Sequence, residues 1–266
     1  MSNAPVANYA VELLYEERPL LSKAEVLTML RDRCGAASAV DVSSPDGLNF
    51  FFPDLRVPAK GSSLPVQVAM TIEGSPLPAS DTEPALKQTW DWKRVRDVVA
   101  KHTARLTLTD LLAVGLPYKS RLSFFHNVLQ GINEFIAPTA ILWRPSQRIV
   151  SPIALTQALR PGDKRDELKG ALNLRRTVTK GPEGIVVDTV GLAAFGLPDL
   201  EAGLGERMPM PVEALLRSLA RYVYDLGDVV TDGRKVPGPP GEGTWMVRTG
   251  RSTVPPDREV LRVGPA

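Results

Sequence analysis

The segment that decides the fold of this chain is Ile185-Val-Val-Asp-Thr-Val-Gly-Leu-Ala-Ala-Phe-Gly-Leu-Pro-Asp-Leu-Glu201. It begins with a run of β-branched apolar residues, which is typical of a strand buried on both faces. Gly191, Gly196 and Pro198 then break the run into a tight, mostly apolar turn. The segment holds only three charged residues, all of them acidic, which argues against a solvated loop. We therefore expect it to form the buried middle of the core.

The whole chain has the composition of an ordinary globular protein. It has 266 residues, of which 43% are hydrophobic and 23% charged, and this is enough for a large core. The net charge of +2 gives no general electrostatic reason to bind nucleic acid or an anionic membrane. Cys34 is the only cysteine, so we expect no intrachain disulfide and a cytoplasmic location. No apolar run approaches the roughly eighteen residues that a membrane helix needs.

Residues 1–113 alternate between strand and helix patterns. Ser22 and Glu25 form a capping box that opens a helix to about Arg33, and a long helix is predicted from Pro84 to about His102. The predicted strands are Tyr9–Tyr15, Ala39–Val42, Leu48–Phe52, Pro65–Ile72 and Arg105–Leu112. This order is close to the split βαβ pattern of ferredoxin-like domains. We therefore expect a ferredoxin-like N-terminal half.

Residues 114–266 are predicted to form a second α+β half, packed on the first. Helices are predicted at Pro117–Ile136 and Val212–Leu226 from apolar residues at helical spacing. Further strands are predicted at Leu172–Thr179, Thr244–Val247 and Val260–Val263. Asp232-Gly233, flanked by β-branched residues, predicts a hairpin. The fold class is thus α+β with mixed, largely antiparallel sheets.

Several sequence blocks carry a family resemblance. They are Val187-Asp-Thr-Val-Gly-Leu-Ala-Ala-Phe-Gly-Leu-Pro-Asp-Leu200, Tyr222-Val-Tyr-Asp-Leu-Gly-Asp-Val-Val-Thr-Asp-Gly233, Trp245 and Pro256-Asp-Arg-Glu-Val260. With the stretch Leu116–Trp143, they resemble a bacterial family known only as a domain of unknown function. This resemblance implies an accessory or immunity protein of a bacterial antagonism system. The segment Glu201–Glu206 lacks the Cys or His residues that often follow in that family, which weakens a metal-site analogy.

The strongest candidates for chemistry are aspartates. Asp188, Asp199, Asp228 and Asp232 lie at predicted strand ends and turns, where carboxylates can bind a divalent cation or act as acid and base. Arg121 or Arg176 could pair with them, and Arg176 could face Asp188 across adjacent strands. The alternative interpretation is that these aspartates cap turns and pair with arginines.

The two histidines and the basic residues have mainly structural interpretations. His102 and His126 lie on predicted apolar helix faces, which favours core histidines, although Arg121 and His126 could line a pocket. The basic run from Lys93 to Arg105 contains Asp97 and is typical of a solvated helix face. The candidate ligand-binding residues are therefore Asp188, Asp199, Asp228, Arg121 and His126.

These observations favour a soluble, non-catalytic protein that binds a protein partner. The sequence contains no nucleotide-binding glycine motif, zinc-protease motif, paired cysteine motif or serine-nucleophile motif, so we predict no catalytic residues, metal ligands or cofactors. The alternative is an enzyme or metal-binding protein that uses Asp188, Asp199 and Asp228. A third hypothesis is a nucleic-acid binder that uses the helix from Lys93 to Arg105. The oligomeric state stays open.

Overall fold

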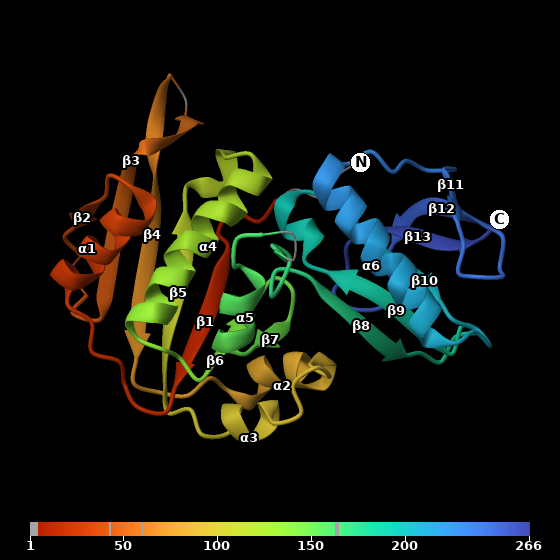
Figure 1. Ribbon diagram of the computed structural model, residues 1–266, viewed down its shortest axis with the longest axis horizontal. Helices are drawn as coiled ribbons and strands as arrows, with labels where there is room; N and C mark the ends of the chain where they lie inside the picture. Colours follow the sequence, from red (N-terminus) through yellow and green to blue (C-terminus); the bar gives the residue numbers. More distant parts are fainter. Residues whose placement is uncertain (1–4, 43, 60, 163–164) are drawn as a thin grey trace. The chain divides into compact units, whose positions relative to one another are not determined.

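The computed structural model describes residues 5–42, 44–59, 61–162 and 165–266 (Figure 1). The chain divides into two compact units. The N-terminal unit comprises Ala7–Ala171, and the C-terminal unit comprises Leu172–Ala266 together with Pro5 and Val6. The division that we predicted after residue 113 falls inside the N-terminal unit. No helix of the described ranges is long and apolar enough to span a bilayer.

The N-terminal unit is built on a seven-stranded antiparallel sheet with the order β2-β3-β4-β5-β1-β6-β7. The strands are β1 (Ala10–Tyr15), β2 (Ser38–Val40), β3 (Gly47–Ala59), β4 (Ser62–Glu73), β5 (Ala104–Leu111), β6 (Ala140–Trp143) and β7 (Arg148–Val150). The predicted mixed α+β class is confirmed, but the ferredoxin-like arrangement is not. A split βαβ motif needs two consecutive parallel strands with a single strand between them, whereas β3, β4 and β5 all lie between β1 and β2, the next strand in the chain.

The helices of this unit are α1 (Lys23–Cys34), α2 (Ala79–Gln88), α3 (Val95–Val99), α4 (Tyr118–Phe135) and α5 (Pro152–Ala158), with a 3₁₀ turn, η1 (Ala113–Gly115). The predicted helix start is confirmed with Ser22 as its N-cap, because the Glu25 N–H donates to Ser22 Oγ at 3.3 Å. The Glu25 carboxylate accepts a hydrogen bond from the Ser22 hydroxyl and not from the Ser22 N–H that a full capping box uses. The long helix predicted from Pro84 to His102 is wrong. Its middle leaves the helical path where Thr89 and Trp90 donate side-chain hydrogen bonds to carbonyl groups in the last turns of α2, so α2 and α3 are separate helices.

The two faces of the N-terminal sheet have different covers. On one face, Phe125 of α4 packs edge-to-face against Tyr9 and Trp143, with ring centroids 5.2 and 6.1 Å away. On the other face, α2 and α3 cover apolar residues of β1, β6 and β7. His102 belongs to the buried structure, and its Nε2 accepts a hydrogen bond from the Leu77 N–H at 2.8 Å. The prediction of a core histidine is confirmed at that position.

The C-terminal unit contains a six-stranded sheet with the order β11-β12-β13-β10-β9-β8. Its elements are β8 (Asn173–Val178), β9 (Ile185–Val190), the 3₁₀ turn η2 (Leu192–Phe195), β10 (Asp199–Gly203), α6 (Pro209–Leu226), β11 (Lys235–Pro237), β12 (Thr244–Arg251) and β13 (Glu259–Pro265). All neighbours are antiparallel except β10 and β13. The segment 185–201 supplies β9, η2 and the start of β10, and β9 is buried from Val186 onward. The predicted buried strand and tight turn are confirmed.

Helix α6 lies across one face of this sheet, against β9 and β10 (Figure 1). Its predicted apolar stripe is buried, including Val212, Leu216 and Val223. The hairpin predicted at Asp232-Gly233 is wrong. The Thr249 N–H donates to Asp232 Oδ1 at 2.7 Å, and the Gly233 N–H donates to Val247 O at 2.9 Å. These bonds attach the turn to β12, so no strand forms before it.

Candidate functional site: a buried ion network

A row of charged side chains crosses five neighbouring strands of the C-terminal sheet. Residues directly opposite one another on paired strands share a face of the sheet. This charge row consists of Arg175 on β8, Asp188 on β9, Glu201 on β10, Arg262 on β13 and Arg248 on β12. Asp188 therefore stands beside Glu201, and Arg262 stands beside Arg248. Because like charges in these positions repel each other, the row requires further partners.

The predicted pairing of Arg176 with Asp188 is wrong by one residue. Arg175 is opposite Asp188, whereas Arg176 is opposite Val187. Since successive residues of a strand point to opposite faces, Arg176 turns toward α6 and forms an ion pair with Glu213 there.

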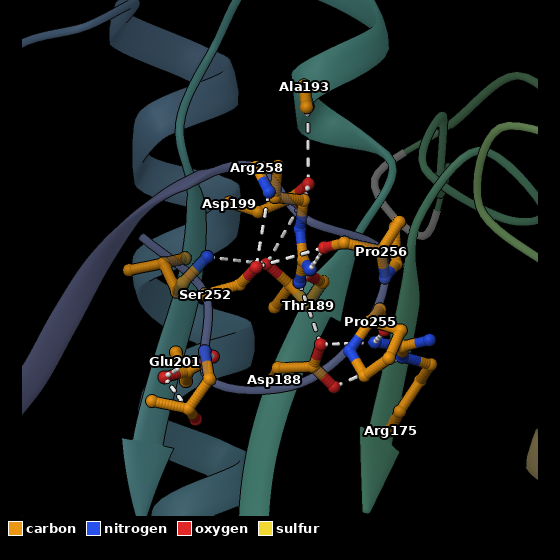
Figure 2. A network of polar contacts seen from close by, with 12 residues as sticks. Arg175, Asp188, Thr189, Ala193, Asp199, Glu201, Ser252, Pro255, Pro256 and Arg258 are labelled. Carbon is orange, nitrogen blue, oxygen red and sulfur yellow. Dashed lines mark hydrogen bonds and ion pairs between the residues drawn. The ribbon is translucent and has the colours of Figure 1, made fainter. Parts of the chain in front are cut away.

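Arg258 joins the two buried aspartates. Figure 2 shows its guanidinium group between the carboxylates of Asp188 and Asp199. Arg258 Nη2 lies 2.7 Å from Asp188 Oδ2, and Arg258 Nε lies 3.2 Å from Asp199 Oδ2. Arg175 Nε approaches the other oxygen of Asp188 at 3.1 Å. Both carboxylates are fully buried, so each of these charge-assisted bonds compensates for lost hydration.

Asp199 also caps the 3₁₀ turn η2. Its oxygens accept hydrogen bonds from the N–H groups of Gly191, Leu192 and Ala193 at 3.3, 3.1 and 3.4 Å. Gly191 has a φ of 136°, which a residue with a side chain rarely adopts. The Thr189 hydroxyl donates to Asp199 Oδ1 at 3.1 Å. Burial raises the pKa of the Asp199 carboxyl, against the lowering effects of Arg258, of the amides and of this hydroxyl.

The segment 252–258 closes over the network. Arg258 Nη1 donates to Pro256 O at 2.8 Å, and Arg175 Nη2 donates to Pro255 O at 2.6 Å (Figure 2). Glu201 accepts hydrogen bonds from the Thr253 N–H at 2.9 Å and from the Thr253 hydroxyl at 2.8 Å. These bonds leave the network well satisfied within the unit, and they fix the path of the segment over the sheet.

The remaining predicted site residues lie elsewhere. Asp228 lies in the exposed segment after α6, outside this network. Arg121 and His126 belong to the N-terminal unit. Arg121 forms a buried bidentate pair with Asp110, with Nε–Oδ2 and Nη2–Oδ1 distances of 2.6 and 2.8 Å. Among the described residues, no group of three or more His, Cys, Asp or Glu side chains is placed to hold a metal ion.

His126 is buried on α4 against the Trp143 ring, with the ring centroids 5.7 Å apart. Neither of its ring nitrogens has a hydrogen-bond partner within the described ranges. Burial, with a smaller contribution from Arg165, lowers the pKa of His126 to about 3. The imidazole is therefore neutral in the folded protein at physiological pH.

Two arginines of the network were missed as site residues. Arg258 is 70 residues from Asp188 and 59 from Asp199, so no local spacing connects them. The available signal was a basic residue directly before an apolar strand, since a cation in such a position needs a buried partner. Arg175 lies within the predicted strand Leu172–Thr179, and the register of that strand decides which of its two arginines faces Asp188.

The fold and network define an α+β protein whose C-terminal unit is organised around buried ion pairs. Residues 188–264 match the model of a family described as Domain of unknown function (DUF4261). This range begins at Asp188 and includes Asp199, Arg258 and the whole of α6. Searches of curated proteins and of solved structures gave no match.

Proposed function

We propose that this protein works by binding a protein partner through the C-terminal unit and not by catalysis. The observation that carries the proposal is a group of exposed apolar side chains. Val178, Met208 and Met210 are 83%, 73% and 72% exposed. Single exposed apolar residues are common, but a group of them is typical of an interaction surface.

An ion pair brings these side chains to one region of the unit. Arg176 on β8 pairs with Glu213 on α6. Val178 is two residues beyond Arg176, and Met210 is three residues before Glu213. The end of β8 and the start of α6 therefore adjoin. We name Val178, Met208 and Met210 the apolar patch. Methionine suits such a surface because its flexible, polarizable side chain adapts to a partner.

The ion network supports a non-catalytic role. An acid, base or metal ligand needs an oxygen that is open to a substrate or an ion, whereas Asp188 and Asp199 are fully buried and bonded to arginines and amides. The family resemblance extends the proposal to an immunity or accessory protein of a bacterial antagonism system. The single, half-buried free thiol of Cys34 supports a cytoplasmic site of action.

The test compares affinity capture by three tagged forms of the full chain. These are the unchanged protein, the double variant Met208→Ser with Met210→Ser, and the control Leu20→Ser. Leu20 is 88% exposed but lies in the N-terminal unit. Substitutions at such exposed positions change stability by no more than about 0.5 kcal/mol.

We expect the unchanged protein and the Leu20 variant to retain the same protein at near-stoichiometric yield, and the double methionine variant to lose it. The captured protein is then identified by mass spectrometry, purified and titrated calorimetrically against all three forms. Equal affinity of the three forms for that protein, or no partner at stoichiometric yield, would refute the proposal.

A further inference from the structure

The outer end of the charge row opens into a groove. A hollow of about 400 Å³ lies over β10, β12 and β13, and its lining includes Glu183, Arg248, Arg262 and Gly264. The Glu183 side chain lies over Gly203 in the floor, whereas Gly264 is uncovered. A Cβ at Gly264 would meet no atom within 4 Å, so the space above it is open. The groove also includes Gly205 and Arg207, which come shortly before Met208 of the apolar patch.

Two arginines face each other in this groove. Arg248 on β12 is directly opposite Arg262 on β13. Arg262 lies 3.5 Å from Glu201 and donates a hydrogen bond to the Arg251 carbonyl. Arg248 is exposed, and its side chain makes no hydrogen bond or ion pair with another described residue. Like charges directly opposite on paired strands are destabilising, and Glu201 compensates the charge of Arg262 but not that of Arg248.

The groove suits a single carboxylate. A guanidinium group presents a planar fork of donors that matches the two oxygens of a carboxylate. Three arginines and two glutamates line the groove, so its positive charge is small and local. A nucleic-acid strand requires a track of cations for successive phosphates, and the glutamates oppose such a track. The charge pattern therefore favours an acidic side chain.

We propose that this groove binds an acidic segment of the protein partner, with one carboxylate held between Arg248 and Arg262. This inference rests on the proposed function and names the chemistry of the partner. Met208 of the apolar patch directly follows Arg207 of the groove in the chain, so a partner that reaches around the end of β10 can contact both. The bound carboxylate completes the charge row at its open end.

The test uses a hexaglutamate peptide as the probe and the full chain at low salt. Binding is followed by the ¹H–¹⁵N resonances of the arginine Nε–H groups and by the backbone amides. A hexaglutamine peptide is the uncharged control. The variants are Arg248→Gln and the matched control Arg217→Gln, because Arg217 is an exposed arginine on α6.

We expect hexaglutamate to shift the resonances of Arg248, Arg262 and Gly264, and hexaglutamine to leave them unchanged. The Arg248 variant should bind the acidic peptide about tenfold more weakly, as expected for loss of a charge-assisted hydrogen bond, whereas the Arg217 variant should bind like the unchanged protein. Equal weakening in both variants would overturn the inference, because it would indicate attraction by net charge alone. Stronger binding of a single-stranded oligonucleotide than of the peptide would also overturn it.

The result separates this inference from the proposed function. Arg248-dependent peptide binding without any captured partner would support the groove and refute the proposed function. A captured partner whose binding depends on the apolar patch but not on Arg248 would support the proposed function and refute the role of the groove.

Discussion

The buried histidine of α4 should make the folded protein sensitive to mild acid. His126 has a pKa of about 3 in the folded protein, because burial disfavours its charged form, and an ordinary value of 6.5 when exposed. The direction of the change in the free energy of unfolding with pH follows from the number of protons that each state binds. Between these two values the unfolded chain binds more protons than the folded one, so the free energy of unfolding falls as the pH falls from 6.5 toward 3.

The size of the effect follows from the two pKa values. At pH 5.5 the unfolded histidine is about nine-tenths protonated while the folded one is neutral, which lowers the free energy of unfolding by about 1.4 kcal/mol relative to neutral pH. At pH 5.0 the loss is about 2 kcal/mol. The replacement His126→Phe removes this proton and keeps an aromatic ring beside Trp143.

Urea unfolding of both proteins at pH 7.5 and 5.5, followed by circular dichroism and by tryptophan fluorescence, measures the difference. Other titrating groups cancel when variant and unchanged protein are compared at each pH. We expect the stability difference to move by about 1.4 kcal/mol in favour of the phenylalanine variant on acidification. His126→Leu provides a second variant if the larger ring disturbs packing. An equal change of stability with pH in all three proteins would refute the low pKa of His126 in the folded state.

Two pairs of substitutions test the register of β8 and the contact of Gly170 with Trp143. Arg175→Met should destabilise the C-terminal unit by about 3 kcal/mol, since it removes one partner of a buried carboxylate. Arg176→Met should cost less than about 1 kcal/mol, because its ion pair is exposed. Equal losses of stability for the two variants in urea unfolding would contradict the register. Gly170→Ala should cost at least about 3 kcal/mol, because its φ is 86° and the new Cβ would lie 2.3 Å from the Trp143 ring. Gly184→Ala, with a φ of 62° and open space, should cost only about 1 kcal/mol, and similar melting temperatures for the two alanine variants would count against the contact.

Elements with a clear period could be predicted from the sequence. Helices α4 and α6 and strands β4 and β5 carry apolar residues at spacings that only one secondary structure satisfies, and their observed bounds lie within three residues of the predicted ones. Local patterns were misleading where a distant strand supplied the deciding bonds. Asp232-Gly233 has the chemistry of a hairpin turn, but it is attached to β12, whose bonds no local pattern reveals.

The charged site was predictable only in its parts. Asp188 and Asp199 were candidates because both belong to the mostly apolar segment 185–201, where a charge needs partners. Their partner Arg258 lies far along the chain, and the choice between Arg175 and Arg176 depends on register, which sequence alone does not determine. Asp228 looked equivalent in the sequence, yet it lies in an exposed segment. The difference between Asp228 and the two network aspartates is burial, and burial depends on the tertiary fold and not on the local sequence.

The charge row links the stability of the C-terminal unit to its proposed binding role. Toward β8, Arg175 and Arg258 neutralise the buried carboxylates; toward β12, Arg248 faces Arg262 in the open groove. A buried ion network adds little net stability compared with apolar packing, but it opposes other registers. A slip of β9 by one residue would turn Asp188 toward α6 without its arginines. The same sheet register that satisfies the buried end of the row places Arg248 and Arg262 opposite each other at its open end, so the strand pairing that the network favours also sets the geometry of the proposed binding groove.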